Sequence, residues 1–323
     1  MKSLVYTAPG VAEVLDRDRP APGPSEVLVQ MVTVGICHSD FDLLAGNYVL
    51  PLEFPLVPGH EWHGRVAEIG SAVTTFAVGD RVVGECSVAA DEHFGFTHDG
   101  ALAEYFTVPA AWLHRIPDTI DDTVAALIEP FIVAYGATRE FDGGDIVAIL
   151  GAGPIGLLAT ASASAKGART IVVEPDAGRR ELARTLGAED VVDPLAGDAT
   201  EQVLELTGGR GATGVVECSG NTAAQASALT MAAYHAQLNY VGINVGGIAQ
   251  AELGLIMGKE LRIRGCMGSF GTSWDATIRF VERLPVDLSA LVSKRFALTD
   301  SLAALEAAKD RNNIKVHIHN PAV

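Results

Sequence analysis

The sequence DIVAILGAGPIGLLATASASAKGARTIVVE, residues 145–174, predicts the fold of the second half of the chain. Within it, the apolar run Ile146–Leu150 leads directly into the glycine turn Gly151–Gly156. An alanine-rich helical pattern follows, and a second apolar run over Thr170–Val173 ends at Glu174. Strand, glycine turn, helix, strand and acidic residue is the order of a βαβ unit that binds a dinucleotide.

The glycine turn has the residues that a pyrophosphate needs. Gly151 allows a sharp turn, Gly153 leaves room for the phosphates against the backbone, and Gly156 lets helix and strand pack closely. The helix that begins at Pro154 and Ile155 offers free N–H groups to a phosphate. The turn therefore predicts a nucleotide site, although a βα turn of this kind also occurs in enzymes that bind no dinucleotide.

Glu174 indicates which dinucleotide is bound. It follows the turn by about 20 residues, where an acidic residue contacts the adenosine ribose. A carboxylate there accepts hydrogen bonds from the ribose hydroxyls and repels a 2′-phosphate, so the sequence favours NAD over NADP. Arg179, which we include among the nucleotide-binding candidates, and Arg180 leave NADP open, because either side chain could reach a phosphate.

Composition narrows the class of protein. The 323 residues suggest about two domains, and an apolar content of 48% is enough for sizeable cores. A formal net charge of −17 argues against a nucleic-acid partner. No apolar run is long enough to span a membrane, and residues 1–10 lack a signal-peptide pattern. The four cysteines show no close pairing, so we expect a reduced, cytoplasmic protein.

The pattern of apolar residues changes near residue 121. Before it, short alternating runs predict a barrel-like, mostly β domain. After it, helical and strand patterns alternate, which predicts an α/β domain of the Rossmann type with a doubly wound parallel sheet. The predicted catalytic domain covers residues 1–130 and 267–323, and the predicted dinucleotide-binding domain covers 131–266.

Individual elements can be assigned within these domains. In the first half, strands are expected at Ser3–Tyr6, Val27–Val34, Gly64–Ile69 and Asp80–Val83. In the second half, further strands are expected at Val191–Val192, Gly214–Glu217 and Gln237–Val241, and helices at Arg179–Leu186 and Thr222–Ala233. The last part should contain helices at Trp274–Arg283 and Ser301–Ala308 and a strand at Lys315–His319.

Three short stretches outside the nucleotide fold carry side chains that can bind a metal. They contain Cys37 in GICHSD, His60 and Glu61 in PGHE, and Glu129 in LIEP. Thiolate, imidazole and carboxylate are ligands of zinc, and a catalytic zinc site keeps one position open. Taken singly, these residues also have ordinary explanations, as a buried thiol, a core histidine and surface acids.

Together the stretches resemble the zinc-dependent alcohol and polyol dehydrogenases of the medium-chain dehydrogenase/reductase family. The similarity extends over nearly the whole chain and includes Gly35–Asp40, Pro58–Glu61, Val78–Val82, Gly100–Tyr105 and the glycine turn. The LIEP stretch and Glu61 are most similar to the sorbitol and threonine dehydrogenase branch. The runs GFTHDG and PGHEW also resemble the cyclitol (2-deoxy-scyllo-inosamine) dehydrogenases of aminoglycoside biosynthesis.

The resemblance implies a GroES-like catalytic domain that holds a catalytic zinc. Cys37 and His60 would bind the metal, and Glu61 would be a ligand or an acid that exchanges with the bound water. Glu129 would bind zinc directly or hold its water. Asp40 would lie behind His60 and orient its ring.

The resemblance also implies how the reaction proceeds. Zinc would act as a Lewis acid toward the alcohol, Ser39 would pass on the hydroxyl proton, and hydride would move to the nicotinamide. Many relatives carry a histidine three residues beyond this hydroxyl, whereas this chain has Asp42, so we expect the relay to end at Asp42 or in water. His38 stands where some relatives place a residue that faces the pyrophosphate, and it either contacts phosphate or faces solvent.

One feature of many relatives is missing. They bind a structural zinc through four closely spaced cysteines, but here the interval Gly84–Asp99 is short and contains only Cys86. We therefore expect one catalytic zinc per chain and no structural zinc, with Cys86 a buried thiol. His93 and His98 are expected to be solvated loop residues.

The resemblance predicts an NAD-dependent zinc dehydrogenase for a secondary alcohol of a small polar substrate, namely a polyol, an amino alcohol or a cyclitol. Two alternatives stay open: a reductase that works toward the alcohol with NAD(P)H, and a zinc-free relative that only binds a nucleotide. Pocket residues are expected near Asn47–Tyr48, His93–Phe96 and Ser269–Trp274. Relatives associate through the nucleotide domain, so we expect a homodimer or homotetramer, with Tyr240–Gly247 as an edge strand used for that purpose.

Overall fold

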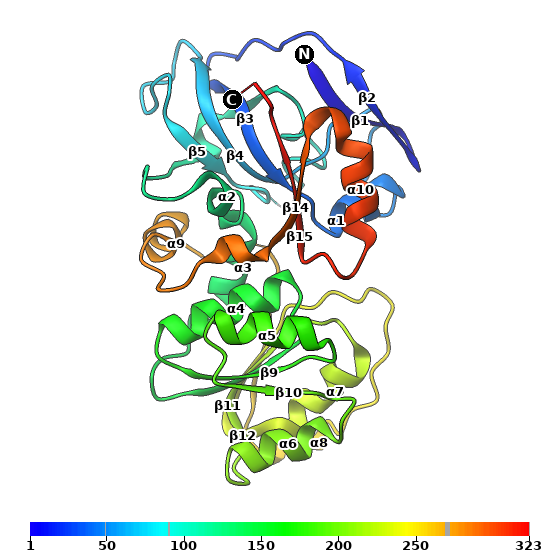
Figure 1. Ribbon diagram of the computed structural model, residues 1–323, viewed down its shortest axis with the longest axis vertical. Helices are drawn as coiled ribbons and strands as arrows, with labels where there is room; N and C mark the ends of the chain where they lie inside the picture. Colours follow the sequence, from blue (N-terminus) through cyan, green and yellow to red (C-terminus); the bar gives the residue numbers. More distant parts are fainter. Residues whose placement is uncertain (49, 90, 269–271, 323) are drawn as a thin grey trace. The chain divides into compact units, whose positions relative to one another are not determined.

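The computed structural model describes residues 1–48, 50–89, 91–268 and 272–322, and the chain divides into two compact units (Figure 1). Unit 1 comprises Met1–Glu129, Ser273–Glu282 and Ser289–Val323. Unit 2 comprises Pro130–Thr272 and Arg283–Leu288.

The second boundary differs from the sequence expectation. The sequence predicts a return to the catalytic domain at residue 267, whereas the return in the structure comes at Ser273, and Arg283–Leu288 again belong to unit 2. One reason is that the backbone N–H of Cys266 still donates to the carbonyl of Tyr240, at 2.8 Å, so the chain follows the sheet of unit 2 beyond its last strand.

Unit 1 is built mainly from β-strands. A two-stranded antiparallel ribbon consists of β1 (Lys2–Ala8) and β2 (Val11–Asp16). The larger sheet has the order β14-β15-β3-β4-β5-β7, with β6 also paired to β3. Its strands are β3 (Glu26–Gly35), β4 (Glu61–Ile69), β5 (Arg81–Gly84), β6 (Tyr105–Pro109), β7 (Leu113–Arg115), β14 (Val292–Ala297) and β15 (Lys315–His319).

Strand β3 lies at the centre of this sheet because its sequence suits burial on both faces. It reads EVLVQMVTVG, and nearly all its residues are buried. It pairs antiparallel with β4, β6 and β15. The apolar side chains on its faces join a core that includes Trp62 and Phe106, whose rings meet edge to face at 4.8 Å. The predicted barrel-like, mostly β domain is confirmed.

Short helices and turns complete unit 1. The helices are α1 (Ser39–Leu44), α2 (Asp122–Ala125), α9 (Trp274–Val281) and α10 (Ser301–Lys309), and 3₁₀ turns occur at Ala110–Trp112, Leu288–Leu291 and Leu298–Asp300. Helix α10 packs against β14 and β15. None of the helices in the described ranges is long and apolar enough to cross a membrane.

Unit 2 contains the predicted parallel sheet, in the order β10-β9-β8-β11-β12-β13. The strands are β8 (Ile146–Leu150), β9 (Arg169–Val173), β10 (Asp190–Val192), β11 (Ala212–Glu217), β12 (Ala232–Tyr240) and β13 (Arg262–Gly265). Each neighbouring pair runs parallel. The doubly wound fold predicted from residues 145–174 is therefore confirmed.

Helices cover both faces of this sheet. The helices are α3 (Ile128–Ala137), which begins in unit 1, α4 (Pro154–Ala165), α5 (Ala177–Thr185), α6 (Ala199–Leu206), α7 (Thr222–Met231) and α8 (Gly254–Gly258). Figure 1 shows α4 and α5 on one face and α6, α7 and α8 on the other. Asp176, Asp198 and Asn221 cap the N-termini of α5, α6 and α7 by accepting backbone N–H groups.

Two expectations near β12 were wrong. The helix predicted over Thr222–Ala233 ends at Met231, and β12 begins at Ala232 and ends at Tyr240. The predicted edge strand Tyr240–Gly247 does not form, since residues 241–250 are outside any strand. Strand β13 already pairs with β12 up to Tyr240, so β13 is the edge of the sheet.

Candidate metal and nucleotide sites

The pairing of β3 with β4 brings the three metal-ligand candidates together. Cys37 follows β3, His60 precedes β4, and Glu61 is the first residue of β4. Gly35 is the register partner of Glu61, so the end of one strand meets the start of the other. One ligand atom from each of Cys37, His60 and Glu61 lies within 4.8 Å of the others, and this is the one such group in the described part of the chain.

Glu61 is held by a residue that the sequence reasoning missed. Lys315, at the start of β15, places its Nζ 2.6 Å from Oε1 and 2.5 Å from Oε2 of Glu61. Both side chains are almost fully buried, with exposed fractions of 4% and 2%. Burial lowers the pKa of Lys315, but the nearby charge of Glu61 outweighs burial and raises it, so Lys315 carries its positive charge.

Gly35 makes room for this pair. A Cβ atom at position 35 would lie 2.5 Å from Oε2 of Glu61 and 3.4 Å from the Lys315 side chain. Any other residue would therefore displace the carboxylate from the group. Packing against Glu61 and Lys315 thus explains why the GICHSD stretch begins with glycine, independently of any turn.

Asp40 lies beside His60, where the sequence analysis expects it. Oδ1 of Asp40 lies 3.5 Å from Nδ1 of His60, while its Oδ2 accepts a 2.8 Å hydrogen bond from the backbone N–H of Cys37. Nε2 of His60 lies 3.5 Å from Oγ of Ser39. Burial lowers the pKa of His60, but the charges of Asp40 and Cys86 and hydrogen bonds to Asp40 and Cys37 raise it well above the ordinary value.

Glu129 lies near this group without belonging to it. It is in the first turn of α3 and is buried. Burial is the largest of the effects that together raise its pKa to about 7; the charge of His60 lowers it, that of Glu61 raises it, and that of Lys315 lowers it. Its carboxylate is not in the set of atoms within 4.8 Å of one another, so this geometry favours Glu61 over Glu129 as the third donor.

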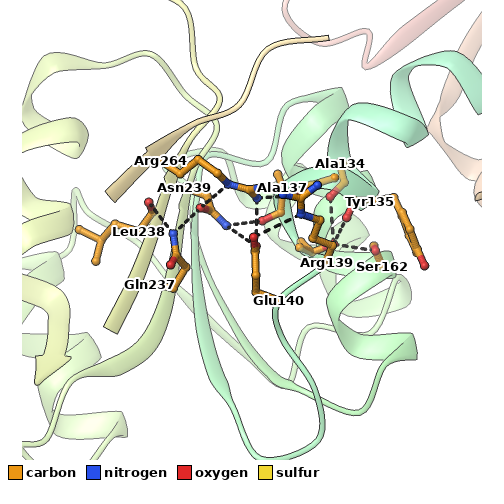
Figure 2. Close-up of polar contacts among 12 residues, drawn as sticks. Ala134, Tyr135, Ala137, Arg139, Glu140, Ser162, Gln237, Leu238, Asn239 and Arg264 are labelled. Atoms are coloured by element: carbon orange, nitrogen blue, oxygen red, sulfur yellow. Dashed lines mark hydrogen bonds and ion pairs between the residues drawn. The ribbon is translucent and has the colours of Figure 1, made fainter. Parts of the chain in front are cut away.

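The far end of α3 is fixed by polar side chains of the sheet (Figure 2). Arg264 of β13 donates to the carbonyl of Gly136 at 2.8 Å and to Oε2 of Glu140 at 2.9 Å. Asn239 of β12 donates to the carbonyl of Ala137 at 2.7 Å. These bonds satisfy carbonyl groups that a helix leaves without partners at its C-terminus, and they hold the helix that carries Glu129.

The residues present fit a catalytic zinc ion. The group offers one thiol, one imidazole and one carboxylate, which is a zinc ligand set with a position left for water or substrate. Zinc bonds of 2.0–2.3 Å separate tetrahedral ligands by roughly 3.5 Å, within the spread of the three atoms. Oε2 of Glu61 forms an ion pair with Lys315 but no further hydrogen bond among the described residues, so a metal ion would compete with Lys315 for this oxygen.

The loop after β5 differs in part from its prediction. Cys86 is buried and its thiol donates to the carbonyl of Phe94, as expected for a plain thiol. His98 is exposed, also as expected, and its ring lies edge-on to Trp112. The expectation for His93 was wrong, because this residue is only 7% exposed and its Nδ1 lies 2.6 Å from the hydroxyl of Tyr48.

The glycine turn has the conformation that its sequence predicts. Gly151 has φ +95°, and a Cβ there would lie 2.8 Å from Ser219. A Cβ on Gly156 would lie 1.9 Å from the carbonyl oxygen of Gly151, so only glycine fits. Gly153 precedes Pro154, the first residue of α4, and nothing lies within 4 Å of the Cβ position of Gly153. This open space at a helix N-terminus fits a pyrophosphate.

Glu174 supports the same turn. Its Oε2 accepts from the backbone N–H of Ala152 at 2.7 Å, and its Oε1 accepts from that of Asp176 at 3.0 Å. Arg180 donates to the carbonyls of Glu174 and Pro175, each at 2.7 Å. It also forms a 2.9 Å ion pair with Asp193. Arg180 is therefore committed to the protein, while Arg179 lies in the first turn of α5.

The remaining candidates, on and before helix α1 and near Trp274, differ in how far they are buried. His38 and Asp42 are exposed, and Ser39 is half-buried at the start of α1. Of the pocket stretch predicted at Ser269–Trp274, residues 269–271 lie outside the described residues. Trp274 is buried, and its ring stacks on that of His114 at 5.1 Å.

Comparison with known proteins gives concordant results. The sequence profile of the family described as zinc-binding dehydrogenase matches residues 154–283, and that of the alcohol dehydrogenase GroES-like domain matches residues 23–118. A sorbitol dehydrogenase from Halalkalibacterium halodurans is 30% identical over 98% of each chain.

Two solved structures have closely similar folds. A protein from Sinorhizobium meliloti 1021 described as a zinc-binding dehydrogenase, bound to NADP, has a TM-score of 0.91 at 28% identity and covers 98% of each chain. The 2R,3R-butanediol dehydrogenase of Bacillus subtilis has a TM-score of 0.89 at 27% identity, covering 98% of this chain and 99% of that one.

Proposed function

Because the chain belongs to the zinc-dependent alcohol and polyol dehydrogenases of the medium-chain dehydrogenase/reductase family, we propose that it oxidises a secondary alcohol of a small polar substrate with NAD. The substrate would be a polyol, an amino alcohol or a cyclitol. The observation that carries the proposal is the buried group of Cys37, His60 and Glu61 in a chain that also contains the dinucleotide turn.

Cys37 and His60 would hold one zinc ion per chain, and Glu61 would be the third ligand or would exchange with a bound water. When bound, zinc supplies Lewis acidity toward the substrate oxygen, and the nicotinamide accepts the hydride. The Nζ of Lys315, which lies 2.6 Å from Oε1 and 2.5 Å from Oε2 of Glu61, would compete with the metal for these oxygens. Glu129 would complete the site as a ligand or as a partner of the water. No structural zinc is proposed, because Cys86 is a buried thiol.

Ser39 is proposed to take the proton of the substrate hydroxyl. Its Oγ lies 3.5 Å from Nε2 of His60, and this distance supports a role next to the proposed metal position. Asp42 follows by three residues on α1, so both side chains point to the same side of the helix. Since Asp42 is exposed, a proton that reached it would pass to water. His38, exposed on the same segment, is proposed to approach the cofactor phosphates.

The preference for NAD rests on Glu174. Its carboxylate is oriented by two backbone N–H groups, and Arg180 is bound to backbone carbonyls and Asp193 instead of being available to a phosphate. Gly151, Gly153, Pro154, Ile155 and Gly156 would contact the pyrophosphate. Arg179, in the first turn of α5, is the other arginine that the sequence offers for a 2′-phosphate if NADP were used.

Replacing Glu174 should therefore relax the nucleotide preference. We expect Glu174→Ala to raise the ratio of kcat/KM for NADP to that for NAD by about tenfold or more, because the like-charge repulsion is removed. Glu174→Gln is the matched control for the turn, since it keeps an oxygen that can accept from Ala152. Initial rates with both nucleotides measure the effect. A wild-type enzyme that already prefers NADP would contradict this assignment.

A substrate screen tests the proposed reaction. Polyols, amino alcohols and aminocyclitols would be offered with NAD, and the absorbance of NADH followed; we expect at least one class to be oxidised. Running the corresponding ketones with NADH and NADPH separates the reductase alternative, which uses the same site. A protein that binds no zinc and turns over neither set would instead be the nucleotide-binding relative.

A homodimer or homotetramer is also proposed. Strand β13 is a sheet edge with Ile263 43% exposed, and unpaired edges tend to pair with another strand. Large apolar side chains are exposed before and after it, namely Leu253, Met257 and Met267. Sedimentation velocity would distinguish the dimer, the tetramer and a contradicting monomer. A cytoplasmic location stays a prediction from the sequence.

A further inference from the structure

Two segments of unit 1 that are far apart in sequence meet in a short hydrogen bond. The hydroxyl of Tyr48 lies 2.6 Å from Nδ1 of His93, across a separation of 45 residues. His93 is 7% exposed, and Tyr48 is half-buried against the core of unit 1. This polar pair has no part in the proposed zinc and proton chemistry.

A stack of rings connects the pair to the metal group. The ring of Tyr48 stacks on that of Phe96, with centroids 4.4 Å apart and planes at 15°. Phe96 in turn contacts the ring of His60, at 4.8 Å. Burial is the main cause that raises the pKa of Tyr48 to about 12; the charges of Cys86 and Cys37 also raise it, and the charge of His60 lowers it. The phenol is therefore neutral and lies one ring away from a proposed zinc ligand.

The hydrogen bonds of His93 decide what Tyr48 can still do. A neutral imidazole has one N–H and one acceptor nitrogen. Burial lowers the pKa of His93, so the ring is neutral. A hydrogen bond between the ring and the backbone of Ala89 acts to raise that pKa, as a bond donated by the ring does. Since Nδ1 faces Tyr48, the N–H on Nε2 is the one available to Ala89. Nδ1 then accepts from the hydroxyl of Tyr48, whose oxygen keeps lone pairs to accept from a ligand.

We propose that Tyr48, held by His93, accepts a hydrogen bond from a hydroxyl or ammonium group next to the reacting carbinol. It would thereby make the enzyme prefer vicinal diols and amino alcohols to simple secondary alcohols. This inference rests on the proposed function and adds to it the feature by which the substrate is selected. Tyr48 is the residue that contacts substrate, and His93 is a positioning residue. An analogue without the neighbouring group would leave the phenolic oxygen without a partner in the complex.

The test compares matched substrate pairs in the zinc-loaded enzyme. The pairs are butane-2,3-diol with butan-2-ol, and trans-cyclohexane-1,2-diol with cyclohexanol. In wild type we expect higher kcat/KM for at least one diol than for its partner. Tyr48→Phe keeps the ring on Phe96 but lacks the hydroxyl, so the ratio of diol to simple alcohol should fall about tenfold. The kcat/KM for the simple alcohol should change less than about threefold.

Two variants of His93 separate positioning from folding. His93→Asn keeps an acceptor close to the place of Nδ1 and should retain most of the preference. His93→Leu removes the acceptor and should lose the preference, mainly through a higher KM for the diol, with zinc content unchanged. If His93→Leu kept the preference for diols, His93 would not be the residue that positions Tyr48.

The possible results separate failure of this inference from failure of the proposed dehydrogenase function. Oxidation of diols and simple alcohols at equal kcat/KM by wild type, or an unchanged ratio in Tyr48→Phe, would overturn the inference and leave the dehydrogenase function intact. No oxidation of any alcohol by wild type with either nucleotide would overturn both.

Discussion

Cys37→Ser is expected to lose its zinc and its dehydrogenase activity together. A thiolate binds zinc strongly, whereas a serine hydroxyl stays protonated near neutral pH and is a poor ligand. His60 and Glu61 alone would then have to hold the ion, and Lys315 competes for Glu61. We expect zinc to fall below about a tenth of an ion per chain and kcat/KM to fall at least about 10³-fold, since the metal contributes several kcal/mol to the reaction. Elemental analysis and initial rates measure the two effects.

Cys86→Ala is the matched control. Cys86 is the other cysteine of unit 1, and it is buried with its thiol donated to a backbone carbonyl. Because it is not a proposed ligand, the variant should keep its zinc and most of its activity. Full activity in a metal-free Cys37→Ser protein would refute the proposed site.

The second large effect is expected on stability. Lys315→Met removes the cation that lies 2.5–2.6 Å from both oxygens of Glu61 and leaves a carboxylate that is 2% exposed without its partner. Breaking a buried ion pair in this way lowers the free energy of unfolding by about 3–5 kcal/mol. The effect should be measured by urea unfolding of chelator-treated protein, so that no metal compensates the charge of Glu61.

The double variant Lys315→Met/Glu61→Gln is the control for lost packing. With the carboxylate neutralised, the buried charge is gone, and most of the lost stability should return. The ion pair does not stabilise the fold as predicted if Lys315→Met alone is as stable as wild type. The same conclusion follows if the double variant is no more stable than the single one.

Much of the fold could be predicted because its signals are local. The apolar runs and the glycine turn lie within one stretch of 30 residues, and the structure shows the two strands and the glycine conformations that they predict. The group of Cys37, His60 and Glu61 could be predicted for a related reason. Its members stand at the ends of two strands, and the family resemblance said which of them to join.

Lys315 could not be found in this way. It lies 254 residues from Glu61, and its strand reads KVHIH, in which a lysine looks like an ordinary first residue. Only the antiparallel pairing of β15 with β3 brings it beside the end of β4. His93 was missed because loop histidines are usually solvated. Its burial depends on Tyr48, 45 residues away in the sequence, as well as on the nearby Phe96.

Competition between segments explains the error at the sheet edge. Tyr240–Gly247 contains residues that suit a strand, but β13 pairs with β12 up to Tyr240. The backbone N–H groups of Val241 and Gly242 both donate to the carbonyl of Glu217, which ends the strand there. A pattern read from one segment does not reveal which neighbour takes the available hydrogen bonds.

The central claim is that a single zinc ion, held by Cys37, His60 and Glu61, makes this chain an alcohol dehydrogenase. The most direct measurement is the zinc content of the purified wild-type protein, followed by activity during removal and return of the metal. The account predicts one zinc per chain and activity that falls and recovers in proportion to it. A protein with no zinc, with two zinc ions per chain, or with activity that survives complete removal of the metal would contradict it.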